Sequence, residues 1–338
     1  MDAIGNKNYP DLEESLLDEN SSLAKMLGLI GNNKQVVDFG CATGYFAQLL
    51  AQQQCIVTGV EINPKAAKVA EQYCQAVIVA DLDFVSVKEI LPHRQFDVAV
   101  FGDVLEHLRN PWQILRDTKE ILTEDGYVVA SIPNIAHGAI RLALLQGEFE
   151  YTEFGILDNT HLRFFTRKTV EDLLENSGYL LKNLESTKLP FLANNNLVPQ
   201  ININDFDSEM INRMQQDENI DTLQFVVRAV PCTVEERLAD RQNRYAKLQK
   251  EFQTAQSELQ QSRQTIDQLQ SELQQSRQTI DQLQSELQQS RQTIDQLQSE
   301  LQQNLDLANA NIQWMETSKF WQLRSNWLKL KVLLKLDN

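Results

Sequence analysis

Short apolar runs alternate with helix-like stretches from the first residues to about residue 231. The runs are rich in valine, isoleucine and leucine and lack a polar residue at every second place, which is typical of strands buried on both faces. Seven runs are expected to be strands: 36–39, 55–61, 76–81, 96–102, 126–133, 179–186 and 222–230. Three stretches are expected to be helices: 45–52, 64–74 and 111–122.

This alternation predicts an α/β fold with a mostly parallel sheet covered on both faces. The segment between the last two runs, 189–219, is polar and holds no apolar crossover helix as long as the earlier ones. Because parallel neighbours need such a crossover, an antiparallel closing strand is expected.

Glycine and proline mark where the pattern stops. All 12 glycines lie at or before Gly178, and all 8 prolines lie at or before Pro231. Glycine and proline mark loops and turns, so a long stretch without either residue can continue as one helix. We therefore expect a globular domain over residues 1–231, a coiled-coil helix over 232–312 and a basic, aromatic tail over 313–338.

A 14-residue unit, QSRQTIDQLQSELQ, recurs from Gln261, Gln275 and Gln289. A period of two heptads is typical of supercoiled helices. Leucine or isoleucine fills every a position, whereas leucine and serine alternate at d, so the coil should be weaker than its length suggests. The a positions are Leu259, Ile266, Leu273, Ile280, Leu287, Ile294 and Leu301, and the d positions are Ser262, Leu269, Ser276, Leu283, Ser290 and Leu297.

Charges beside this seam favour parallel pairing of two or more chains. Each g-position glutamate precedes an e-position arginine by five residues, which is the geometry of an interchain pair. The pairs are Glu258 with Arg263, Glu272 with Arg277, and Glu286 with Arg291. Exposed pairs contribute at most ~1 kcal/mol each, so they select orientation more than they stabilise the coil. The sequence therefore predicts a parallel homo-oligomer, with a solitary solvated helix as the alternative.

The net charge bears on which partners the protein can bind, and the cysteines bear on where in the cell it is found. The formal net charge is -16 and the isoelectric point is about 4.7, so the surface repels polyanions and no nucleic-acid partner is expected. The four cysteines show no CxxC spacing and lie in or beside apolar runs, which favours reduced thiols and a cytoplasmic location. The N-terminal segment has no signal-peptide pattern, and no run of ~18 apolar residues is present to span a bilayer.

The stretch VVDFGCATGYFAQLLA, residues 36–51, ends a strand with an aspartate and two glycines. A dinucleotide fingerprint would need glycine at positions 42 and 45, where this chain has Ala42 and Tyr45, so a nicotinamide oxidoreductase fits badly. A carboxylate at Asp38 would repel a pyrophosphate but suits a ligand with an amino group and a sulfonium charge. The glycines at 40 and 44 let backbone approach such a ligand closely.

Two further acids follow the next strands. Glu61 closes the second run and is placed to accept hydrogen bonds from ribose hydroxyls, and Asp81 closes the third and could accept from an adenine amine. Single acids at strand ends are usually turn residues. Several in register at neighbouring strand ends instead indicate one ligand, S-adenosylmethionine.

Residues 9–230 resemble the class I S-adenosylmethionine-dependent methyltransferases of the small-molecule branch. The matching stretches include VVDFGCATG, VTGVEINPKAAKVA, FDVAVFGDVLEHL and GILDNTHLRFF. The resemblance implies a Rossmann-like, seven-stranded, mostly parallel sheet with a reversed last strand. It also implies Asp38, Gly40 and Gly44 around the methionine moiety, Glu61 on the ribose, Asp81 and Leu82 at the adenine, and Asp103 near the amino-acid end. Many members have glycine where this chain has Ala42.

The catalytic residues are expected near the mouth of the sheet. Asp103, Glu106 and His107 are spaced i, i+3 and i+4, on one face if the segment opens a helix. With His161 they form a carboxylate and histidine cluster in which His107 or His161 could act as general base. The same arrangement is similar to that of metal-dependent ribose- and quinol-methylating relatives, where matching positions hold a divalent ion. The remaining alternative is a purely structural role for both histidines.

The acceptor is not specified by these residues. Residues 140–151 are expected to form a lid over it. The tail joins lysines and arginines to Phe320, Trp321 and Trp327, which suits either peripheral contact with a membrane or a cap on the neighbouring coil. It also resembles the ends of bacterial chains that modify surface polysaccharides. We therefore expect methyl transfer, mainly to oxygen, of a small-molecule or glycan acceptor, with a non-catalytic adaptor or scaffold as the alternative.

Overall fold

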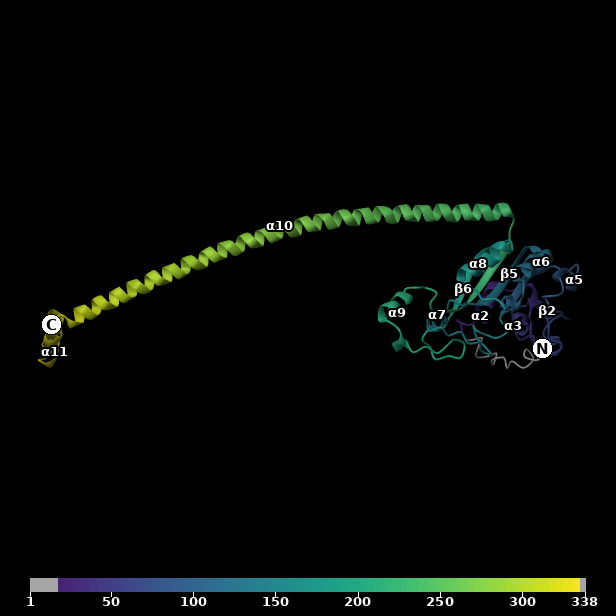
Figure 1. The fold of residues 1–338 in the computed structure, drawn as a ribbon, viewed down its shortest axis with the longest axis horizontal. Helices are drawn as coiled ribbons and strands as arrows, with labels where there is room; N and C mark the ends of the chain where they lie inside the picture. The colour runs from purple at the N-terminus through teal and green to yellow at the C-terminus, as the bar shows by residue number, and fades with distance from the viewer. Residues whose placement is uncertain (1–17, 335–338) are drawn as a thin grey trace. The chain divides into compact units, whose positions relative to one another are not determined.

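The computed structural model describes residues 18–334 of the chain, and the predicted domain's residues 1–17 and the tail's residues 335–338 lie outside that range. The chain divides into two compact units, Met1–Arg244 and Tyr245–Asn338. The first unit contains a seven-stranded sheet with the order β3-β2-β1-β4-β5-β7-β6. Figure 1 shows this unit, with helices such as α3 (Tyr45–Gln52) and α8 (Arg167–Asn176) around the sheet. Its strands are β1 Gln35–Phe39, β2 Ile56–Glu61, β3 Ala76–Val79, β4 Phe96–Gly102, β5 Leu122–Pro133, β6 Tyr179–Lys188 and β7 Thr222–Pro231.

Strands β1 to β5 are parallel, and β7 lies between β5 and β6, antiparallel to both. The predicted Rossmann-like sheet with a reversed last strand is therefore confirmed. The reversal follows from the connection, since the residues between β6 and β7 form a 3-10 turn, η3 Ile203–Asp205, and only a short helix, α9 Ser208–Met214. A connection without a long crossover helix suits antiparallel neighbours.

Helices cover both faces of the sheet, because successive side chains of its strands point to opposite sides and nearly all are apolar. Val36 packs on one face with residues of α2, α3 and α4, and Val37 packs on the other with residues of α5, α6 and α8. These helices are α2 Ser22–Ile30, α3 Tyr45–Gln52, α4 Pro64–Ala70, α5 Val87–Ile90, α6 Pro111–Thr118 and α8 Arg167–Asn176. On the second face the rings of Phe39 and Phe101 stack at 4.8 Å.

Several element ends differ from the sequence prediction. The helix expected over 64–74 ends at Ala70, where the amides of Tyr73 and Cys74 both return to the Ala70 carbonyl in a turn. The third strand ends at Val79, two residues before Asp81. The helix expected over 111–122 ends at Thr118 and is followed by a 3-10 turn, η2 Lys119–Ile121. Strand β5 therefore starts at Leu122, earlier than predicted, with a register shift against β4.

The long C-terminal helix is confirmed. Helix α10 runs over Val234–Thr317, 84 residues, which is about 125 Å at the rise of an α-helix. Its first turns belong to the first unit, where Arg241 forms an ion pair with Glu175. Ser318 ends it, and its hydroxyl accepts the Trp321 amide to open α11 Lys319–Leu333. Coiling of α10 against another chain stays a prediction.

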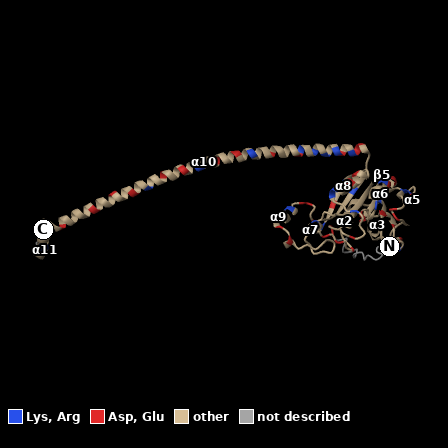
Figure 2. Cartoon of the chain, in the orientation of Figure 1, with Lys and Arg blue, Asp and Glu red and all other residues tan. Residues whose placement is uncertain are grey.

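Helix α10 is polar on most of its surface, with acidic and basic side chains distributed along it (Figure 2). On α11 the aromatic residues Phe320 and Trp327 are exposed, and membrane contact by this segment stays a prediction. Within residues 18–334, no helix has the length and apolarity needed to cross a bilayer. The four cysteines are free thiols, and three of them are buried.

Candidate active site

Four acidic residues lie at or just beyond the carboxyl ends of four neighbouring strands. In the spatial order β3-β2-β1-β4, Asp81 follows β3, Glu61 ends β2, Asp38 lies one residue before the end of β1, and Asp103 follows β4. Because these strands are parallel, their carboxyl ends meet at one edge of the sheet, the edge where α/β folds bind ligands. The structure thus brings the predicted cofactor residues to one edge.

The loop after β1 is held in left-handed backbone conformations. Gly40 and Gly44 have φ angles of 76° and 81°, and Ala42 between them has 47°. A Cβ at position 40 would lie 2.5 Å from a methyl of Val104, and one at position 44 would lie 2.9 Å from the Cα of Ala70. Both glycines are therefore required. The left-handed conformation of Ala42 explains why glycine is the common residue there.

Glu61 connects this loop to the end of β2. Its Oε2 accepts the Ala42 amide at 2.9 Å and its Oε1 accepts the Asn63 amide at 2.8 Å. The side chain is 7% exposed. A carboxylate oxygen can accept more than one hydrogen bond, so Glu61 retains the capacity to accept from two ligand hydroxyls while it shapes the loop.

Asp38 is buried at the centre of this edge. It lines a small cavity with Gly40, Tyr45 and Gly102. Burial raises the pKa of the Asp38 carboxyl well above its ordinary value, and the nearby Cys74 and Glu61 raise it further. A cationic ligand would favour the ionised form, so ligand binding at this edge should lower the pKa of Asp38 and thereby favour proton release.

We expect Asp38→Asn to stabilise the ligand-free protein and to weaken the binding of S-adenosylmethionine. The folded-state pKa lies above the unfolded one, so the acid's contribution to stability is present at low pH and is lost as pH rises through the folded pKa. Asparagine cannot ionise, so the variant does not lose this stability at high pH. At pH 8 we therefore expect the Tm of Asp38→Asn to exceed that of wild type by about 2–4 °C. This is the shift that about 1 kcal/mol produces in a domain of this size.

Calorimetry in two buffers of different ionisation enthalpy measures the accompanying proton release. Wild type should release a proton on binding and the variant should not. A lower Tm for Asp38→Asn, together with unchanged proton release, would contradict this role of the buried acid.

Asp81, Leu82 and Asp103 complete the predicted cofactor set. Asp81 is half-buried and its Oδ1 accepts the Asp83 amide at 3.0 Å, while Leu82 packs against the core. Asp103 has a φ of 53°. Its Oδ1 accepts from the Ser131 hydroxyl at 2.8 Å and from the Gln224 side chain at 2.7 Å.

The segment after β4 is not the helix whose first turn would align Asp103, Glu106 and His107. It is a 3-10 turn, η1 Leu105–His107, and Asp103 lies outside it, held toward β5 and β7 by the bonds above. Glu106 and His107 instead form a group with His161, in which one donor atom of each residue lies within 4.8 Å of the others. Because of the role that we propose for them, we call these three residues the catalytic cluster.

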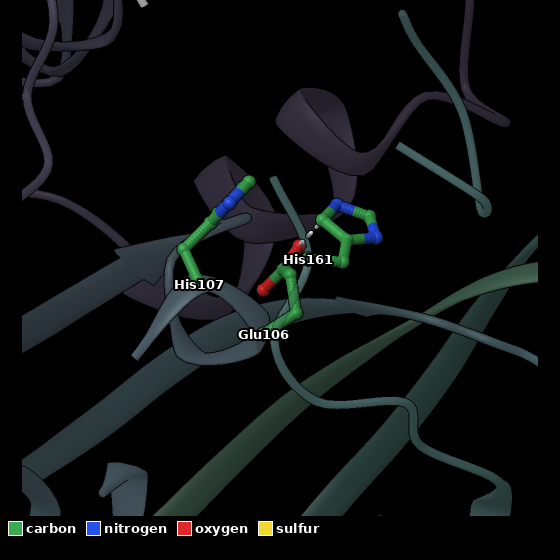
Figure 3. A group of neighbouring side chains, drawn as sticks. All are labelled: Glu106, His107 and His161. Atoms are coloured by element: carbon green, nitrogen blue, oxygen red, sulfur yellow. Dashed lines mark ion pairs between the residues drawn. The ribbon is translucent and has the colours of Figure 1, made fainter. Parts of the chain in front are cut away.

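Backbone contacts bring His161 to this cluster. The amides of Leu162 and Arg163 donate to the Glu106 carbonyl at 2.9 and 3.0 Å. The two imidazole rings meet edge to face with centroids 4.8 Å apart. Figure 3 shows the Glu106 carboxylate directed at His161, whose Nε2 lies 4.0 Å from Oε1. Glu106 is 1% exposed and His161 is 8% exposed.

The hydrogen bonds of both histidines fix where their lone pairs lie. His107 Nδ1 faces the Thr160 carbonyl at 3.2 Å and the Thr160 hydroxyl at 3.1 Å, and that hydroxyl donates to Asp158 at 2.6 Å. His161 Nδ1 faces the Ile156 carbonyl at 3.0 Å. A carbonyl acceptor beside Nδ1 favours the tautomer that carries its proton on Nδ1, and this tautomer has its lone pair on Nε2. Thr160 and Asp158 could not be identified from the sequence, because the contact between Thr160 and His107 joins positions 53 residues apart.

His137 is part of the scaffold. Its Nδ1 accepts the Ala139 amide at 3.3 Å, which opens helix α7 Gly138–Leu145, and its Nε2 donates to the Leu189 carbonyl at 2.8 Å. Burial lowers the pKa of this imidazole, in agreement with a neutral ring. Both of its ring nitrogens are thus engaged by backbone groups of the protein.

The segment expected to form a lid begins inside helix α7, where Ile140 and Leu142 are buried. Beyond that helix, Glu148 and Glu150 line a pocket of about 270 Å³ together with Thr152, Ile140 and Leu157. Phe149 and Tyr151 contact each other edge to face at 5.5 Å, and Phe149 contacts Phe164 at 5.8 Å. Phe164 in turn lies 6.3 Å from the His161 ring. Phe164 thus connects this segment to the catalytic cluster.

Comparison with known proteins places the first unit in a family. A methyltransferase-domain family model matches residues 14–183. A ubiquinone biosynthesis O-methyltransferase from Glaesserella parasuis is 32% identical over 133 residues, which are 37% of this chain and 55% of that protein. The corresponding protein from Histophilus somni is 28% identical over 123 residues, 34% of this chain and 52% of its own. The chain thus spans about half the length of the curated relatives that it matches.

The chain is also similar to solved structures at low sequence identity. A methyltransferase from Archaeoglobus fulgidus, described as dependent on S-adenosylmethionine, is 20% identical with a TM-score of 0.44, covering 65% of this chain and 94% of its own. The family model covers half of the chain, and its match agrees with the strand-end acids and the glycine loop. The protein therefore belongs to the methyltransferase-domain family, in the class I, S-adenosylmethionine-dependent branch that its sequence resembles.

Proposed function

We propose that the protein transfers the methyl group of S-adenosylmethionine to a hydroxyl oxygen of a small-molecule or glycan acceptor. The observation that carries the proposal is the placement of Asp81, Glu61, Asp38 and Asp103 at the ends of four adjacent strands. Acidic side chains along one edge suit a ligand that is cationic and rich in hydroxyl and amino donors. The names of the curated relatives, which are O-methyltransferases, favour oxygen over nitrogen as the acceptor atom.

Each residue of the edge has a role that follows from its position. Glu61 accepts from the ribose hydroxyls, and Asp81 with Leu82 holds the adenine. Asp38 and the loop Gly40–Gly44 lie at the sulfonium and amino-acid end, where the charge of the Asp38 carboxylate is opposite to that of the ligand. Asp103 is fixed by Ser131 and Gln224 beside the same end.

The catalytic cluster provides the base. The acceptor oxygen attacks the methyl carbon, the carbon–sulfur bond breaks, and the electron pair stays on sulfur, which gives S-adenosylhomocysteine. An imidazole Nε2 takes the hydroxyl proton. His161 is suited to this because the Glu106 carboxylate, 4.0 Å away, stabilises the imidazolium that results. Such a base contributes about 10²- to 10⁴-fold to rate.

The same donor set fits a divalent cation. Two imidazoles and one buried carboxylate lie close together, and each imidazole is oriented through Nδ1 by a backbone carbonyl, as is usual for metal-binding histidines. A bound ion would lower the pKa of the acceptor hydroxyl. Glu106, His107 and His161 would hold it.

Methyl-labelled S-adenosylmethionine tests the proposal. We expect the full-length protein to transfer label into the small-molecule or glycan fraction of a bacterial lysate and to release S-adenosylhomocysteine in equal amount. Parallel reactions with a chelator, and with Mg²⁺, Mn²⁺ or Zn²⁺ restored, separate the metal from the base role. Binding of the cofactor without any label transfer or S-adenosylhomocysteine release would favour an adaptor protein instead.

A further inference from the structure

We propose that α10 pairs with α10 of a second copy of this chain in a parallel, in-register coiled coil, and that the serines at every second d position set the alignment. This self-association goes beyond methyl transfer. In the single chain, the apolar side chains at the a and d positions of α10 are exposed to solvent. The leucines and isoleucines from Leu259 to Leu297 are each 53% to 58% exposed, and none is buried.

A row of this length is unusual for a helix that stays alone. Leucine and isoleucine recur at a and d with a period of seven residues, which places them in one stripe along α10. Fully burying such a side chain is worth about 1.5–3 kcal/mol. A second copy of the same stripe covers it, because identical knobs and holes repeat at the same spacing.

The charges beside the stripe choose a parallel partner. In the single chain, Glu272 and Glu286 accept hydrogen bonds from Gln268 and Gln282. Over residues 18–334, none of the ion pairs includes Arg263, Arg277 or Arg291. A parallel partner places each of these e-position arginines opposite a g-position glutamate. An antiparallel partner places g opposite g, and the complementarity is lost.

The serine positions separate the correct alignment from a slip of one heptad. In register, each d-position leucine faces the same leucine of the other chain, and each d-position serine faces the same serine. These leucines are Leu269, Leu283 and Leu297. A slip of seven residues makes these leucines face serines, except that Leu297 of one chain faces Asn304. It also places Glu272 opposite an e-position glutamine, Gln270 or Gln284, in place of an arginine. All d layers are then mismatched at once.

A slip of two heptads restores the repeat but fails at its end. The d positions beyond Leu297 are Asn304 and Asn311. After a slip of 14 residues, Asn311 faces Leu297, so that an amide is placed against an apolar side chain, which is unfavourable. One full repeat also loses its partner. The in-register arrangement is therefore the one that satisfies every layer.

Cysteine cross-linking tests orientation and register on the full-length chain. Ser262→Cys and Ser290→Cys introduce thiols at d positions near the two ends of the repeats, and Ser299→Cys introduces one at f, on the outer face. With oxidised glutathione as the oxidant, two thiols form one disulfide and two glutathione thiols are released. We expect both d variants to give a covalent dimer in high yield and the f variant to stay at the wild-type level.

An antiparallel pair can place residue 262 opposite residue 262 of the other chain, or residue 290 opposite residue 290, but not both at once. Cross-linking of both d variants therefore requires parallel pairing. Sedimentation should give wild type about twice its mass of 38.8 kDa. A monomer, or cross-linking of the d variants no greater than that of Ser299→Cys, would overturn the proposal. Both readouts are independent of methyl transfer, so they can fail while the proposed function stands.

A leucine substitution tests the role of the serines. Ser262, Ser276 and Ser290 changed together to leucine should raise the melting temperature of the helix and replace the single dimer with mixed or larger assemblies. The matched control changes the f-position serines, Ser271, Ser285 and Ser299, to leucine and should leave the dimer and its melting unchanged. A d-position triple variant that stays a single dimer of wild-type melting temperature would show that the serines do not set the alignment.

Discussion

Glu61→Ala is expected to weaken the binding of S-adenosylmethionine by about 100-fold or more. Glu61 couples the proposed ribose site to the loop after β1, since its two oxygens accept hydrogen bonds from the amides of Ala42 and Asn63. The substitution removes both ribose acceptors, and hydrogen bonds to a charged group are each worth about 1.5–3 kcal/mol. It also leaves two backbone amides without their acceptor, so the loop loses its support. Calorimetry gives the dissociation constant directly.

Two variants separate these effects. Glu71→Ala removes a glutamate just beyond α4 whose partner is the exposed Lys68, and it should leave the dissociation constant unchanged. Glu61→Gln keeps the shape but replaces one acceptor with a donor, and we expect an intermediate loss of affinity. Wild-type affinity in Glu61→Ala would show that the cofactor does not lie on this edge.

Glu106→Gln is expected to lower methyl transfer by about 10²- to 10⁴-fold while the affinity for S-adenosylmethionine stays within a factor of two or so. Glutamine has nearly the shape of glutamate, so the cluster remains packed, but the amide cannot stabilise a positive charge on His161 at 4.0 Å. The loss therefore concerns the transition state and not the bound cofactor. Release of S-adenosylhomocysteine measures turnover, and calorimetry measures affinity.

Controls for this variant distinguish chemistry from unfolding. Glu124→Gln changes an exposed residue of β5 and should leave turnover and Tm at the wild-type values. His161→Asn should match Glu106→Gln in turnover, and the double variant should be little worse than either, because the two residues act together. Full turnover in Glu106→Gln with retained Tm would exclude the cluster from the reaction.

The sheet could be predicted from the sequence because both of its faces are buried. Runs such as 96–102 are apolar almost throughout, and glycine and proline mark their ends. The glycine loop was predictable for a related reason, since Gly40 and Gly44 adopt left-handed conformations and approach other atoms closely. Local chemistry decides such features, and local chemistry is visible in a sequence.

The catalytic cluster was predictable in composition but not in shape. The spacing of Asp103, Glu106 and His107 indicated one helical face, yet bonds from Ser131 and Gln224 hold Asp103 away from that face. The approach of His161 depends on amides of Leu162 and Arg163 that bind the Glu106 carbonyl. Such contacts join distant parts of the chain, and a single sequence carries no periodic signal for them.

In our proposal, four adjacent strand ends form one site for a cationic nucleoside. A crystal structure of the full-length protein with S-adenosylhomocysteine, the product form of that nucleoside, would show whether they do. We expect one ligand per chain, with its ribose hydroxyls on Glu61, its adenine beside Asp81 and Leu82, and its amino-acid end at the loop Gly40–Gly44. A ligand bound at any other surface, or a Glu61 carboxylate with no contact to the ribose, would contradict it.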